Sequence, residues 1–275
     1  MGGFFVGLVT DGFLPVFLAL LHHLPTVVVL LTVVSLFEHS GFALGFSCTT
    51  LAIGTLDKNA DPLYKRRMTR FLTFIPCAAK APVLLFLLTL MGLSVFLVVA
   101  LYIFALAIGI ILGGNHVVRC PKFKRMTFNQ FVWGIFLNII EFLKRISIGL
   151  ILAVAVLYTL QYLGWLLPMA EFIQPLFAPI GLTAPLIVAL LFGLIAKEMI
   201  IGVVVAFGVA SLGLTTAIMS SFIVFVLLYT TCFPSLMAIR AKLGFRYACK
   251  IAALNFAVAY IAALIVFNVA VIIAL

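Results

Sequence analysis

The sequence predicts an all-α, polytopic membrane protein with a single domain. Hydrophobic residues make up 66% of the 275 positions, charged residues make up 9%, and the mean hydropathy is +1.39. Charged residues normally make up about a quarter of a globular chain. Here they fall in short stretches and leave uncharged runs long enough to cross a bilayer as helices. We therefore predict about seven to eight hydrophobic segments, some of them broken or re-entrant, in one transmembrane domain over residues 1–275.

The formal net charge of +10 fits the same interpretation. The cations lie in short segments between predicted spans, where the positive-inside rule concentrates lysine and arginine. Cations so placed contact the lipid bilayer through its anionic head groups. We therefore expect no nucleic acid as a partner.

Other classes are excluded by what the sequence lacks. The five cysteines form no closely spaced zinc pattern, and their odd number argues against a disulfide framework. The first residues carry no basic region and no cleavage site, so we expect no signal peptide. No phosphate-binding loop is present, so coupling to a nucleotide would need another chain.

The first predicted repeat covers residues 13–113. Its elements are a span, a short apolar segment, a charged loop and two further spans, over residues 13–37, 41–56, 57–70, 71–91 and 95–113. The segment 41–56 is short for a span, so we expect a re-entrant hairpin there.

The second repeat, over residues 146–275, follows an interfacial segment. Residues 127–145 alternate apolar and polar side chains at helical spacing, which predicts an amphipathic helix along the membrane surface. The repeat then consists of a span, a proline-rich connection, a long span that is the second re-entrant candidate, a broken span and a last span, over residues 146–167, 168–181, 183–210, 216–239 and 251–274.

Two proline-containing breaks interrupt the predicted spans, at residues 74–82 and 229–234. Each places a thiol, Cys77 or Cys232, beside a proline. A proline inside a helix frees the carbonyl four residues before it, and a freed carbonyl at membrane depth must be buried in protein or line a cavity. Sulfur beside free carbonyls is a candidate site for a transition-metal cation. The alternative is a kinked helix in which a small apolar cysteine fills a gap.

The two repeats resemble each other. Residues 45–54 align without gaps on residues 193–202, both stretches begin and end with glycine, and each is followed by a Cys–Pro break. Weak internal symmetry with interrupted helices at matching places points to a transport site near the bilayer midplane.

Ionisable and thiol side chains inside these spans are the candidate ligands, because such groups are costly in a membrane. Glu198 is either a cation ligand or proton carrier, or a carboxylate held by a buried basic partner. Lys80 is either that partner or a gate charge. Glu38, with the histidine after it, forms an entry site or a solvated helix end. Cys48 lies among small polar residues. This cluster either coordinates an ion or allows close packing of helices. The predicted metal ligands are Cys77, Cys232, Glu198, Cys48 and Glu38.

The motifs around these residues resemble the transmembrane core of the ferrous iron transport protein B family, which is built from two Gate motifs. The similarity extends over nearly the whole chain. It is carried by Asp11-Gly12, Glu38-His39-Ser40-Gly41-Phe42, Phe46-Ser47-Cys48, Pro76-Cys77-Ala78-Ala79-Lys80-Ala81-Pro82-Val83, Ala196-Lys197-Glu198 and Leu228-Tyr229-Thr230-Thr231-Cys232. The segment around Cys77 is the most specific match.

The resemblance implies a non-enzymatic permease that takes up Fe²⁺ across the inner (cytoplasmic) membrane of a prokaryote along the predicted Cys/Glu ligands. Iron would be the transported ion, and no permanently bound cofactor is expected. The family normally carries a GTP-binding domain, so we expect GTP hydrolysis on a separate small GTPase. An accessory iron-transport protein and a second copy of this chain are further candidate partners. Two alternatives stay open: a Gate-domain transporter of a nucleoside-like or other organic solute, and a non-transporting membrane scaffold.

Overall fold

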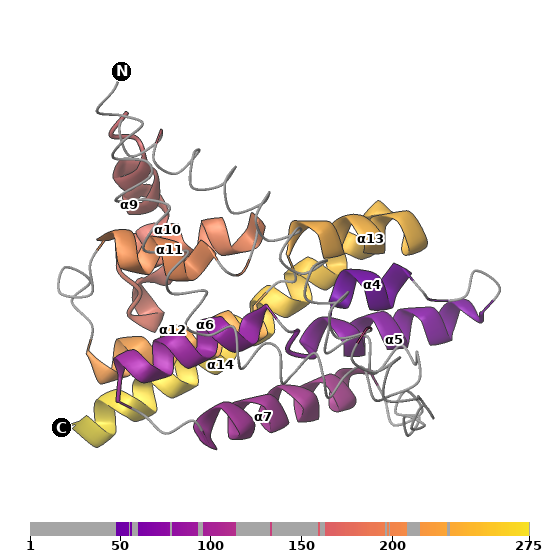
Figure 1. Cartoon of the computed structure of the whole chain (residues 1–275), viewed down its shortest axis with the longest axis horizontal. Coiled ribbons are helices and arrows are strands. Elements are labelled where there is room, and N and C mark those ends of the chain that lie inside the picture. The colour runs from indigo at the N-terminus through magenta and orange to yellow at the C-terminus, as the bar shows by residue number, and fades with distance from the viewer. Residues whose placement is uncertain are drawn as a thin grey trace.

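The computed structural model describes residues 48–54, 56, 60–77, 79–92, 96–113, 133, 159, 163–195, 197, 199–207, 215–229 and 232–274. Within these ranges every regular element is a helix (Figure 1), which confirms the all-α prediction. The predicted span over 13–37, the amphipathic helix over 127–145 apart from Trp133, and most of the span over 146–167 lie outside the described residues.

The described helices differ widely in length, from a single turn to 30 residues in the last one. They are α4 (Thr49–Gly54), α5 (Pro62–Phe74), α6 (Lys80–Leu90), α7 (Phe96–Gly113), α9 (Leu166–Phe177), the 3₁₀ helix η3 (Ala178–Ile180), α10 (Ala184–Ile195), α11 (Met199–Phe207), α12 (Thr216–Leu228), α13 (Phe233–Leu243) and α14 (Phe245–Ala274).

Some of these helices meet the length and hydropathy needed to cross a membrane. Among the described residues, Thr216–Leu243 taken across its break and Phe245–Ile272 both qualify. A third span is added if Pro168–Ile180 and Ala184–Leu194, which are bent by 101°, form one crossing. The protein is therefore a membrane protein with broken helices, as predicted.

Two predicted irregular segments are helical instead. The expected charged loop over 57–70 is helix α5 from Pro62 onward, with the side chain of Asp61 accepting a hydrogen bond from the backbone N–H of Tyr64. Its apolar residues recur at spacings of three and four and are buried, at Met68, Phe71 and Leu72. The charged side chains of this helix lie away from its buried face, so they do not prevent it from forming.

The expected proline-rich connection over 168–181 is also mostly helix, in α9 and η3. Pro168 lies in the first turn of α9, where its missing N–H would have no helical partner, and Pro175 lies in the last turn. The chain then turns at Gly181, which has a φ of +76°. Glycine adopts this left-handed backbone at little cost.

Buried side chains form two cores that share α14. The large core takes residues from α6, α10, α11, α12 and the second half of α14, among them Leu87, Leu186, Ile200, Phe222 and Ala263. The small core takes residues from α4, α5, α13 and the first half of α14, among them Ile53, Phe71, Ile239 and Ile251. In Figure 1, α4, α5 and α13 lie together at one end of the protein, and α14 continues past them alongside α12.

The Cys–Pro breaks lie where the chain passes between these cores. Phe74 packs in the large core and the next residue, Ile75, packs in the small core. In the same way, Tyr229 packs in the large core and Ile239 in the small core. The two broken segments therefore meet at the border between the cores, and this border positions the candidate site.

Candidate functional site at three helix breaks

The first predicted break is present, but its prolines separate helices and do not kink one. Helix α5 ends at Phe74, Ile75 has extended backbone, and α6 begins at Lys80. Pro76 lies between the helices and Pro82 in the first turn of α6. A proline in the first turn costs no helical hydrogen bond. The expected freeing of carbonyls within a continuous helix is therefore wrong here.

The second break has the same construction. Helix α12 ends at Leu228, Tyr229 has extended backbone, and Cys232 is the N-cap of α13. Pro234 again lies in the first turn of the following helix. The unpaired carbonyls at this break are those that any helix leaves in its last turn.

A third break divides the long span predicted over 183–210. Helices α10 and α11 are separated at residues 196–198 and pack against each other, as a hairpin requires. Gly193 permits this packing, because a Cβ there would lie 2.7 Å from the Ile200 side chain and 3.0 Å from the Tyr229 hydroxyl. Re-entrance into the membrane stays a prediction for this segment.

Lys80 joins the first two breaks. Its side chain is 2% exposed, and its ammonium donates a hydrogen bond to the backbone carbonyl of Leu227, in the last turn of α12. The thiols of Cys77 and Cys232 both lie close enough to this ammonium for charge–charge interaction. Two cysteines from the two predicted repeats thus lie within electrostatic range of one buried cation.

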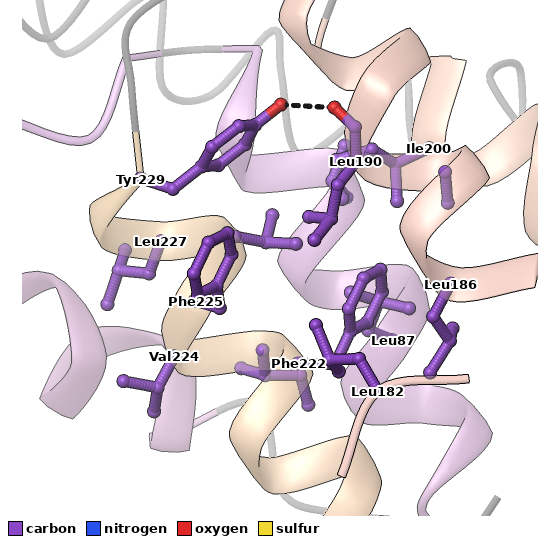
Figure 2. Close-up of a cluster of buried hydrophobic side chains, with 14 of the residues drawn as sticks. Leu87, Leu182, Leu186, Leu190, Ile200, Phe222, Val224, Phe225, Leu227 and Tyr229 are labelled. Carbon is purple, nitrogen blue, oxygen red and sulfur yellow. Dashed lines mark hydrogen bonds between the residues drawn. The ribbon is translucent and has the colours of Figure 1, made fainter. Parts of the chain in front are cut away.

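Lys197 joins the third break to the second. This lysine is also 2% exposed, and its ammonium lies 3.4 Å from the centroid of the Tyr229 ring. Figure 2 shows the Tyr229 hydroxyl donating to the carbonyl of Leu190 in α10, at 2.7 Å. The Tyr229 ring also stacks on Phe225, with the centroids 5.4 Å apart. Two buried ammonium groups therefore lie at the carboxyl end of α12, where helix carbonyls favour positive charge.

The small polar segment of the first predicted repeat reaches the same region through Thr50. The Thr50 hydroxyl of α4 and the Ser235 hydroxyl of α13 are 2.8 Å apart, and the thiol of Cys232 is 3.3 Å from the same Ser235 oxygen. Cys48 is half-buried and immediately precedes α4. Residues from both repeats thus converge on Cys232.

Tyr102 is a residue of this region that sequence reasoning missed. Its hydroxyl is buried and has no hydrogen-bond partner. It lies close enough to Cys77 for electrostatic interaction. A sequence signal existed, since Tyr102 is the one side chain with a polar group in the otherwise apolar stretch Phe96–Gly113.

The remaining predicted ligands are placed only in part. Glu198 and Glu38 lie outside the described residues. Within the ranges that the structure describes, no three histidine, cysteine or acidic side chains gather as a metal site would require. The ligand roles of Cys77 and Cys232, like the rest of the predicted ligand set, therefore stay a prediction.

The segment that contains the second and third breaks matches a known protein family. Residues 132–246 match the family model described as Gate, nucleoside recognition. This stretch is similar to the Gate family over somewhat less than half of the chain. The Gate segment contains Lys197, Tyr229 and Cys232, whereas Cys77 and Lys80 precede it.

A curated relative extends the similarity. The Fe(2+) transporter FeoB of Methanocaldococcus jannaschii is 23% identical over 178 residues, an alignment that covers 54% of this chain and 27% of the relative. The chain therefore spans about a quarter of the length of that protein. No solved structure matches the chain. The predicted resemblance to the Gate core of ferrous iron transport proteins is confirmed.

Proposed function

We propose that this chain is the membrane pore of a divalent-metal permease that takes up Fe²⁺ across the cytoplasmic membrane. The observation that carries the proposal is the buried Lys80 ammonium, which donates to the Leu227 carbonyl and lies within electrostatic range of Cys77 and Cys232, from two separate helix breaks. The Gate match and the similarity to a protein named as an Fe(2+) transporter support it.

The chemistry of the donors favours a transition metal. Thiolate sulfur binds soft and borderline ions in preference to Mg²⁺ or Ca²⁺. Cys77 and Cys232 are half-buried, and the Lys80 ammonium near them donates to the Leu227 carbonyl at the end of α12. We assign Glu198 as the third ligand, with Cys48 and Glu38 as further ligands along the path. We expect GTP hydrolysis on a separate chain and no covalent chemistry on this one.

Iron uptake into proteoliposomes tests the proposal. Purified protein is reconstituted, and ⁵⁵Fe²⁺ entry is measured under anoxic conditions for the wild type and for Cys77→Ser and Cys232→Ser. We expect each variant to reduce uptake by about tenfold or more, since disturbing the partners of metal ligands alone costs about 10–100-fold in affinity or activity.

The matched control is Cys249→Ser, because Cys249 is an exposed cysteine near the start of α14. Its uptake should equal that of the wild type. Full uptake by both Cys77→Ser and Cys232→Ser would exclude the thiol-lined path. Uptake of a labelled nucleoside without uptake of iron would favour an organic solute as the substrate.

A further inference from the structure

Lys80 is an unusual residue to find between two candidate ligands for a cation. A lysine at membrane depth is costly unless its charge is paired or hydrogen-bonded. Here the ammonium donates a hydrogen bond to the Leu227 carbonyl, and the thiols of Cys77 and Cys232 lie within range of electrostatic interaction with it. The carbonyl that receives the ammonium, and the two thiols near it, are therefore groups that a metal cation would use.

The carbonyl that holds Lys80 is available for this role. Leu227 lies in the last turn of α12, where carbonyls have no helical N–H partner. The end of α12 also carries the negative pole of the helix dipole, which favours any cation placed there. Lys80 itself begins α6, so its charge lies on a side chain that reaches from one helix start to the end of another.

Unused hydrogen-bonding capacity remains beside this position. The Tyr102 hydroxyl is buried, has no partner, and lies near Cys77. Buried polar groups are normally paired, so an unpaired hydroxyl within electrostatic range of a thiol is a position for a further ligand or a bound water. The ammonium thus fills only part of the coordinating capacity of this site.

We propose that the Lys80 ammonium is a tethered competitor, which occupies the cation position between Cys77, Cys232 and the Leu227 carbonyl until an entering divalent ion displaces it. The inference rests on the proposed function and adds the residue that sets affinity and selectivity. An ammonium and a divalent ion repel each other strongly at a few ångströms in a buried site, so the two occupy the position in turn. Lysine suits this role because its charge lies on a flexible stem of four carbons.

This competition has two functional consequences. A weakly binding ion fails to displace the ammonium, so the position stays closed to it. A strongly binding ion is held less tightly than its ligands alone would hold it, which permits release. Lys80 is therefore a specificity-determining residue and not itself a metal ligand.

Protection of the thiols from alkylation tests the proposal. Detergent-purified protein is treated with N-ethylmaleimide at increasing concentrations of Fe²⁺ under anoxic conditions. Modification at Cys77 and Cys232 is measured separately by mass spectrometry, with exposed Cys249 as the internal reference. Lys80→Met keeps most of the stem and removes the charge, whereas Lys80→Arg keeps the charge.

We expect the half-protecting Fe²⁺ concentration to fall by at least about tenfold in Lys80→Met, and to stay near the wild-type value in Lys80→Arg. Lys80→Gln is the second neutral variant, used if Lys80→Met elutes as an aggregate, because its amide retains a donor for the Leu227 carbonyl. An unchanged or higher half-protecting concentration in the folded neutral variant overturns the proposal, and so does a failure of Fe²⁺ to protect either thiol in every variant.

The same experiment separates this inference from the proposed function. If the wild type takes up no ⁵⁵Fe²⁺ but Fe²⁺ protects the thiols more strongly in the neutral variant, transport is refuted and the competition stands. If uptake occurs and the neutral variant shows no gain in protection, transport stands and the role of Lys80 is refuted.

Discussion

The contact between Lys197 and Tyr229 gives the sharpest test of how the breaks are held together. The perturbation is Tyr229→Leu, which keeps an apolar side chain at a position that is 5% exposed. The substitution removes the hydroxyl bonded to Leu190, the ring under the Lys197 ammonium, and the stacking on Phe225. Tyr229→Phe removes the hydroxyl alone.

The expected losses follow from these contacts. A net hydrogen bond contributes about 1 kcal/mol, a desolvated cation–π contact about 2 kcal/mol, and an aromatic pair about 1 kcal/mol to the free energy of unfolding. We therefore expect a loss of about 4 kcal/mol for Tyr229→Leu and about 1 kcal/mol for Tyr229→Phe. In a Lys197→Met background, Tyr229→Leu should cost about 2 kcal/mol less, because the cation is already absent.

The assay is the apparent unfolding temperature of the purified protein in detergent, followed by tryptophan fluorescence at one fixed scan rate. A coupling of about 2 kcal/mol corresponds to about 4–8 °C in a chain of this size. The four proteins of the cycle are compared in the same detergent. Equal losses for Tyr229→Leu with and without Lys197 would refute the cation–π contact as a structural link between α10–α11 and α12.

Two further stability predictions use matched controls. Gly181→Ala should lower the unfolding temperature, because a φ of +76° costs alanine about 1–2 kcal/mol and the added Cβ would overlap the ring of Phe267. The control Gly54→Ala should not lower it, because a Cβ added at Gly54 has no atom within 4 Å. Thr50→Val should cost about 1 kcal/mol of unfolding free energy by removing the hydroxyl that pairs with Ser235, and the same change at exposed Thr89 should cost less. Both pairs are measured as differences in apparent unfolding temperature, and each expectation fails if the control falls as far as the test variant.

Local chemistry made the breaks predictable from sequence. Proline cannot occupy a helix interior without loss, so the positions of Pro76 and Pro234 indicated the interruptions in advance. The errors came where one local rule was given too much weight. The charges of α5 and the prolines of α9 suggested loops, but one face of α5 is buried and the prolines of α9 lie near its ends.

The convergence of the three breaks could not be predicted in the same way. Lys80 meets the carbonyl of Leu227 across 147 positions of sequence, and Thr50 meets Ser235 across 185. No periodicity within a single segment encodes such a contact, because it depends on how the two cores share α14. Sequence reasoning selected Cys77 and Cys232, both of which lie within electrostatic range of the Lys80 ammonium, and their role as ligands stays a prediction; it missed Tyr102 and gave Lys197 no role.

The internal repeat predicts one contact in addition to those that the structure describes. The gapless alignment of 45–54 on 193–202 pairs Thr50 with Glu198, and the pairing of Cys77 with Cys232 matches Lys80 to Ser235. The Thr50–Ser235 contact between the repeats thus predicts, by repeat symmetry, that Glu198 acts on Lys80. Glu198 lies outside the described residues, so the prediction rests on the alignment. Glu198→Gln should reduce Fe²⁺ uptake in both backgrounds, because the carboxylate is a proposed ligand, and should reduce it more in the wild type than in Lys80→Met, where no ammonium is left for the carboxylate to balance. Equal reductions in both backgrounds would show that Glu198 acts on the ion alone.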